Sequence, residues 1–124
     1  MNLMTIEHIR KVTNSKLDPK KKSELGQYMT PSVIAEYMAS LFTLGPKNIK
    51  LLDCGAGIGS LTVSAIKRLK DISLIELWEI DPIMQEQLEI NMQTQPAPSL
   101  IHKEDFILGA VENLLSSQGE RYTY

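Results

Sequence analysis

Apolar residues recur along this chain in two alternating patterns, one typical of buried strands and the other of amphipathic helices. Short apolar runs at 49–52, 73–79 and 100–102 predict strands, and the middle run is dense enough in apolar residues for both sheet faces to be covered. After each run, apolar residues return every three or four positions, which predicts helices. Strands that alternate with helices are typical of parallel sheets with right-handed crossovers. The pattern therefore predicts an α/β, Rossmann-like fold that is partial, with about three parallel strands.

Two further helices are expected before the first strand. In residues 5–13 apolar positions lie about one turn apart, and this helix should end before Asp18-Pro19, because the residue ahead of a proline is disfavoured in a helix. Thr30 and Pro31 fit the N-cap and the first position of a second helix, which Gly45-Pro46 would end. Five apolar residues of that helix share one face: Val33, Ile34, Tyr37, Met38 and Leu41.

Length and composition are those of one compact globular domain. The chain has 124 residues, of which 43% are hydrophobic and 23% charged. Residues 1–22 hold six basic and two acidic residues, whereas the rest of the chain carries an acidic excess. We expect an N-terminal helix and basic linker over 1–23 and one domain over 24–124. The basic segment suits a phosphate backbone, although a solvated lysine-rich linker explains the same charges.

The single cysteine, Cys54, excludes an intrachain disulfide and favours a reducing, cytoplasmic setting. No apolar run approaches the ~20 residues that a membrane helix needs, so neither secretion nor membrane insertion is expected. Cys54 itself is most simply a buried thiol, and His8 and His102 lack neighbours at metal-ligand spacing. We therefore expect no metal site.

A glycine-rich segment follows the first predicted strand, where Asp53 begins the pattern Asp-x-Gly-x-Gly-x-Gly with Gly55, Gly57 and Gly59. Glycines at a strand-to-helix turn allow positive φ and let a ligand lie against bare backbone. The spacing differs from the Gly-x-Gly-x-x-Gly of dinucleotide sites, and Asp53 can reach a cationic amine. A cofactor that carries an ammonium group and no pyrophosphate fits this segment better than a dinucleotide.

Acidic residues also follow the second and third predicted strands. Glu79 ends the second, where a carboxylate can accept both hydroxyl hydrogens of a ribose, and Ile80 offers an apolar surface for adenine. Asp105 follows the third, where it can accept from the exocyclic amine of adenine, and Phe106 can cover the ring edge. Each carboxylate also fits a simpler role as a helix N-cap or first-turn acid. Together with the glycine segment, they favour one nucleoside-binding crevice.

Four motifs in this order resemble the adenine-N6 DNA methyltransferases of bacterial restriction–modification systems, in their gamma-class arrangement. They are GQYMTP at 26–31, LLDCGAGIG at 51–59, EIDP at 79–82 and EDF at 104–106. The first is the most specific, because most other S-adenosylmethionine enzymes lack it ahead of the glycine segment. The resemblance implies a Rossmann-like methyltransferase fold, S-adenosyl-L-methionine as cofactor and DNA as partner.

The resemblance also implies a role for nine residues in binding the cofactor. Thr30 and Pro31 would contact the methionine end, and Asp53, Gly55 and Gly57 would line the amino-acid portion. Glu79 would bind the ribose, Ile80 and Phe106 the faces of the adenine, and Asp105 its amine.

The family's catalytic signature, Asn-Pro-Pro-Tyr, is absent from these 124 residues. We therefore expect a domain truncated before the catalytic strand, inactive alone, with no catalytic residue of its own and with DNA bound through the missing C-terminal part. One alternative is a non-catalytic assembly module that pairs its open sheet edge with itself or a partner chain. Another is a fragment of an RNA or protein methyltransferase, against which residues 26–31 argue.

Overall fold

The computed structural model describes residues 3–20 and 29–116. The predicted domain boundary between residues 23 and 24, part of the GQYMTP motif and the last eight residues lie outside the described part. The chain forms the following elements: α1 (Leu3–Lys16), α3 (Ser32–Ser40), β1 (Ile49–Asp53), α4 (Ser60–Arg68), β2 (Ile72–Trp78), α5 (Pro82–Gln93), β3 (Ser99–His102) and α6 (Phe106–Ser116). Within the described residues, no helix is both long and apolar enough to cross a bilayer.

The three strands form one open, parallel sheet in the order β1-β2-β3. Asp53 pairs with Leu77 and Trp78 pairs with His102, so the carboxyl ends of the strands meet at one edge. This confirms the predicted α/β class, and the arrangement is consistent with a partial Rossmann-like methyltransferase fold. Within the described residues β1 pairs with β2 alone, which leaves its other edge open.

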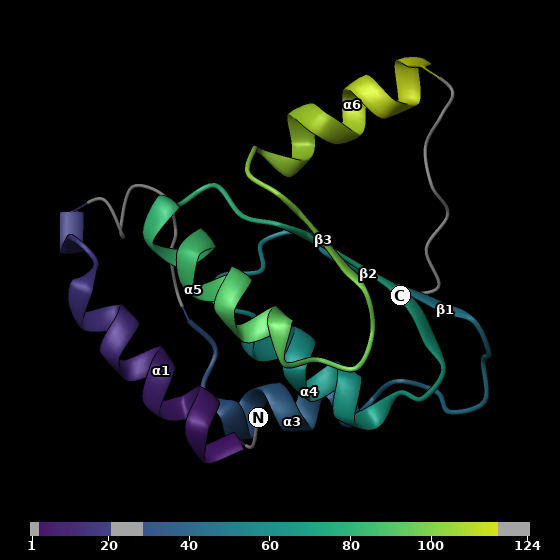
Figure 1. Ribbon diagram of the computed structural model, residues 1–124, viewed down its shortest axis with the longest axis horizontal. Coiled ribbons are helices and arrows are strands. Elements are labelled where there is room, and N and C mark those ends of the chain that lie inside the picture. The colour runs from purple at the N-terminus through teal and green to yellow at the C-terminus, as the bar shows by residue number, and fades with distance from the viewer. Residues whose placement is uncertain (1–2, 21–28, 117–124) are drawn as a thin grey trace.

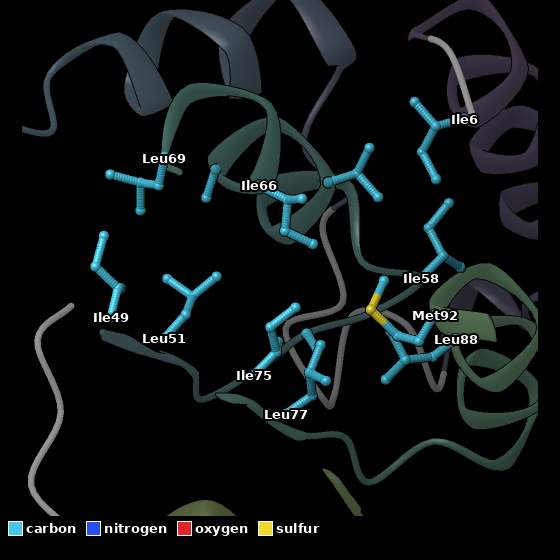
Figure 2. Close-up of a cluster of buried hydrophobic side chains, with 13 residues drawn as sticks. Ile6, Ile49, Leu51, Ile58, Ile66, Leu69, Ile75, Leu77, Leu88 and Met92 are labelled. Carbon is cyan, nitrogen blue, oxygen red and sulfur yellow. The ribbon is translucent and has the colours of Figure 1, made fainter. Parts of the chain in front are cut away.

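Helices lie on both sides of the sheet (Figure 1). α1, α3, α4 and α5 lie on one side, and α6 lies on the other. Buried apolar side chains fill the space between the sheet and the first group of helices (Figure 2): Ile49 and Leu51 from β1, Ile75 and Leu77 from β2, Ile66 from α4, and Leu88 and Met92 from α5. Ile6 of α1 belongs to the same cluster and lies beside Ile58 of the glycine segment. Thus α1 packs on the core that supports the sheet.

α3 differs from the sequence expectation in its bounds and in its packing. It begins at Ser32, one residue later than predicted, because Pro31 has an extended backbone (φ −59°, ψ 147°) and occupies the N-cap position. The helix ends at Ser40, well before Gly45. The five apolar residues predicted to form its buried face are all exposed, with Val33 79% and Tyr37 67% exposed, and the last of them, Leu41, follows the helix as its C-cap. The buried residues of α3 are small ones, Ser32, Ala35 and Ala39, which allow a close approach to its neighbours.

Candidate functional site

A cavity of about 210 Å³ opens at the carboxyl ends of the three strands. Its walls come from residues 29–30 ahead of α3, residues 54–58 of the glycine segment, the start of α4, residues 78–80 at the end of β2 and residues 104–106 after β3, with Met84 from α5. Each wall therefore follows directly from a strand end or precedes a helix, which is where ligands bind in open parallel sheets.

The cavity brings together seven of the nine residues that the sequence singled out: Thr30, Gly55, Gly57, Glu79, Ile80, Asp105 and Phe106. Pro31 and Asp53 are not among its lining residues. Asp53 lines a neighbouring apolar groove of about 380 Å³ between β1, α3 and α4. Leu61 lines both the cavity and the groove, so the two hollows adjoin there.

The glycine segment turns sharply and is fixed by backbone hydrogen bonds. Gly57 and Gly59 have φ values of 57° and 92°, in the left-handed region that favours glycine. The amide of Ala56 donates to the carbonyl of Trp78 (2.9 Å), and the amide of Gly59 donates to the carbonyl of Ala56 (2.8 Å). A Cβ built on Gly55 would meet no heavy atom within 4 Å, so the space beside this residue is open.

Glu79 holds the glycine segment from the end of β2. Its side chain is 7% exposed, and its Oε2 accepts a hydrogen bond from the Gly57 amide (2.7 Å) while Oε1 accepts from the Asp81 amide (3.0 Å). The N-cap of α5 is Asp81, which accepts from the amides of Ile83 and Met84. The alternative that Glu79 caps this helix is therefore wrong. A carboxylate has about four acceptor positions, so Glu79 retains capacity for ligand hydroxyls.

Asp105 combines both roles that the sequence left open. Its Oδ1 accepts hydrogen bonds from the amides of Ile107 (2.9 Å) and Leu108 (3.1 Å), so it caps α6. It also lines the cavity. Because the cap occupies one carboxylate oxygen, the other remains as an acceptor toward a ligand.

Asp53 is engaged with its own neighbours. Its Oδ2 accepts from the Thr62 hydroxyl (2.6 Å), and the Gly55 amide donates to Oδ1 at 3.5 Å. Burial raises the pKa of this carboxyl, and the two hydrogen bonds oppose that rise. None of the ion pairs within the described residues includes Asp53. A cation brought to this carboxylate would favour its charged form.

Stacked aromatic side chains form one wall of the cavity. Trp78 lines the cavity and stacks on His102 with ring centroids 3.9 Å apart, and Phe106 meets Trp78 edge to face at 5.6 Å. Gly109 of α6 passes so close to Trp78 that a Cβ would lie 2.4 Å from its ring. Pairing of β2 with β3 creates this wall, and no local sequence pattern reveals it.

Two further residues, Cys54 and Asn91, lie in or against the glycine segment. The expectation of a buried Cys54 is wrong: the thiol is exposed, because the residue follows β1 in a turn that lines the cavity. Desolvation and the nearby Asp53 charge raise the pKa of Cys54. Asn91 of α5, fully buried, donates to the Ile58 carbonyl (2.8 Å) and so holds the glycine segment from behind. Within the described part of the chain, no group of three potential ligands could hold a metal ion.

Comparison with known proteins gives two relatives and no matching family model. The chain is 38% identical to the type II methyltransferase M.BsuBI of Bacillus subtilis over 137 residues, which cover 98% of this chain and 27% of that protein. It is 34% identical to the type II methyltransferase M.PstI of Providencia stuartii over 128 residues, which cover 89% of this chain and 24% of that protein. The chain thus spans about a quarter of the length of these relatives.

Proposed function

We propose that this chain is the S-adenosylmethionine-binding portion of a site-specific DNA methyltransferase that modifies adenine N6. The observation that carries the proposal is the cavity, which collects side chains from the ends of all three strands around one hollow. The similarity to two type II methyltransferases supports a methyl-transfer role. The motif order supports adenine N6 as the target, and a cytoplasmic setting follows as a prediction from the same assignment.

The nucleoside half of the cofactor fits one side of the cavity. Glu79 would accept hydrogen bonds from the ribose hydroxyls, because the glycine segment fixes its carboxylate without exhausting its acceptor positions. Asp105 would accept from the adenine amine, and the apolar surfaces of Ile80 and Phe106 would cover the ring. The cavity volume lies below the ~300–1,000 Å³ of complete ligand sites, so the described residues enclose part of such a ligand.

The amino-acid half would lie toward Leu61 and the adjoining groove. Gly55 offers open space beside bare backbone, and Thr30 lines the same cavity. Asp53 would meet the cofactor's ammonium group, which would offset the buried negative charge of its carboxylate. Pro31 would act by holding the backbone extended beside Thr30 rather than by forming part of the cavity wall.

S-adenosylmethionine supplies a sulfonium methyl group, and the residues that line the cavity bind and orient the molecule that carries it. Transfer to adenine N6 also needs acceptors for the amine hydrogens and a pocket for the flipped base. The Asn-Pro-Pro-Tyr signature that meets this need is absent from the sequence. We therefore propose a cofactor-binding role, and no catalytic role, for the residues that line the cavity.

Calorimetric titration with S-adenosylmethionine tests the proposal. Glu79→Ala should weaken binding by roughly 1–3 kcal/mol, the cost of leaving buried polar groups unpaired. Glu86→Ala, on the exposed surface of α5, is the matched control and should bind as the unaltered chain does. Circular dichroism of each variant would check that the fold is retained. No measurable binding by the unaltered chain, or equal affinity in Glu79→Ala, would overturn the assignment.

A second candidate is an assembly module that uses the same fold without methyl transfer. The open edge of β1 favours it, as do the exposed apolar side chains on α3 and α6. Contiguous exposed apolar surface marks sites of protein association. Such a module would need no cofactor, so binding of S-adenosylmethionine distinguishes the two functions.

A further inference from the structure

The segment ahead of α3 is held at both of its ends. Met29 packs partly against the buried core, and Ser32 is bonded to Glu7 of α1. Between them, Thr30 lines the cavity and Pro31 keeps the backbone extended. The position of Thr30 in the cavity wall therefore depends on the two contacts that flank it.

Glu7 supplies the cap that α3 lacks in its own sequence. Pro31, at the N-cap position, forms no side-chain cap bond. The Glu7 Oε2 accepts hydrogen bonds from the Ser32 amide (3.0 Å) and from the Ser32 hydroxyl (2.9 Å). A carboxylate at this end of a helix also interacts favourably with the helix dipole. A residue 25 positions earlier in the chain thus fixes where α3 begins.

Arg10 fixes the carboxylate of Glu7 in turn. Its Nε donates to Oε2 (3.0 Å) and its Nη2 donates to Oε1 (2.6 Å), a two-point contact that defines the orientation of the carboxylate plane. One residue before Glu7, Ile6 is 1% exposed and lies beside Ile58 of the glycine segment (Figure 2). Ile58 lines the cavity as well. α1 consequently contacts both the glycine segment and the Thr30 segment.

We propose that Glu7 is a positioning residue for cofactor binding, which holds Thr30 against the amino-acid end of the ligand by capping α3. The inference rests on the proposed function for the identity of the ligand. Loss of the cap would release the Thr30 segment. The nucleoside end would be unaffected, because Glu79 and Asp105 are held by other bonds.

Two ligands separate this role from a general effect on the fold. S-adenosylhomocysteine carries the amino-acid end, whereas 5′-methylthioadenosine has the nucleoside and lacks that end. Glu7→Ala should weaken binding of S-adenosylhomocysteine about five- to tenfold, the usual effect of losing a helix cap. The affinity for 5′-methylthioadenosine should change by less than about twofold. Glu7→Gln keeps an acceptor for Ser32 and should recover most of the lost affinity.

Hydrogen exchange on the same variants tests positioning without any ligand. The amides of Ser32 and Val33 should exchange faster in Glu7→Ala, and those of Gly57 and Gly59 should not. Glu36→Ala, an exposed residue of α3, is the matched control. Unchanged exchange at Ser32, or an equal loss of affinity for both ligands, would overturn the positioning role. Faster exchange at Ser32 in a chain that binds neither ligand would confirm that Glu7 caps α3 but would overturn the proposed function and, with it, the role in cofactor binding.

Discussion

Gly59 and Gly55 lie in the same loop, yet replacing each with alanine should change the free energy of unfolding in opposite directions. Gly59 is the N-cap of α4, with φ 92° and ψ 21°. A Cβ there would lie 2.9 Å from the Met92 Cε and 3.1 Å from the Leu88 Cδ1. The φ of Gly55 lies outside the left-handed region, and a Cβ there would meet nothing within 4 Å.

The magnitudes follow from these two environments. A residue with a side chain in the left-handed region costs about 1–2 kcal/mol, and crowding of a packed core adds about 1–3 kcal/mol. The Met92 methyl is the end of a flexible side chain and can move, whereas Leu88 is fully buried. We therefore expect Gly59→Ala to lower the free energy of unfolding by about 2–4 kcal/mol. Gly55→Ala should raise it by up to about 1 kcal/mol, because alanine reduces the entropy of the unfolded chain.

Urea unfolding followed by circular dichroism measures both changes, and the fluorescence of Trp78, the only tryptophan in the chain, gives an independent signal. Coincident transitions by the two methods would justify a two-state analysis. The methyl group of Gly55→Ala would also occupy space beside the cavity, so this stable variant should bind S-adenosylmethionine more weakly. Equal unfolding free energies for the two variants would contradict the conclusion that Gly59 and Gly55 differ in backbone conformation and in the space available for a Cβ.

Two further predictions concern pH and association. The Arg10 guanidinium and the Ser32 amide lower the pKa of Glu7 from 4.5 to about 2, so the stability that this carboxylate contributes is complete above pH 4.5 and is lost as the pH falls toward 2. The difference in unfolding free energy between the unaltered chain and Glu7→Gln should therefore shrink between about pH 6 and about pH 3. The open edge of β1 should make the isolated chain associate with rising concentration, and sedimentation as a monodisperse monomer at every concentration would contradict this.

The order of strands and helices could be predicted from the sequence because apolar residues repeat at a different spacing in each type of element. The strands that the pattern predicts at 49–52, 73–79 and 100–102 agree with the observed strands to within one residue at each end. The strand ends then brought Glu79, Asp105 and the glycine segment to one edge, as parallel topology requires. The spacing of apolar residues predicts the elements, and the parallel arrangement of the strands then predicts that their carboxyl ends share one edge of the sheet.

What the sequence did not reveal depends on contacts between distant residues. The bond between Glu7 and Ser32 and the bond between Asn91 and Ile58 join residues 25 and 33 positions apart, and neither pair forms a recognisable pattern. The packing of α3 shows a second limit. Periodicity identifies an apolar face, but the face that is buried against the core is the one with small residues such as Ala35.

The exposed apolar surface of α6 is linked to the cavity, because residues at the start of this helix also line the cavity. Leu114 and Leu115 are 79% and 82% exposed, a degree of exposure typical of surfaces that another polypeptide covers. Asp105 both caps α6 and lines the cavity, and Phe106 begins the helix against Trp78. Any polypeptide that packs on α6 would therefore restrict the motion of two cavity residues. Because ordering a site in advance lowers the entropy cost of binding, coverage of α6 and affinity for the ligand should be coupled.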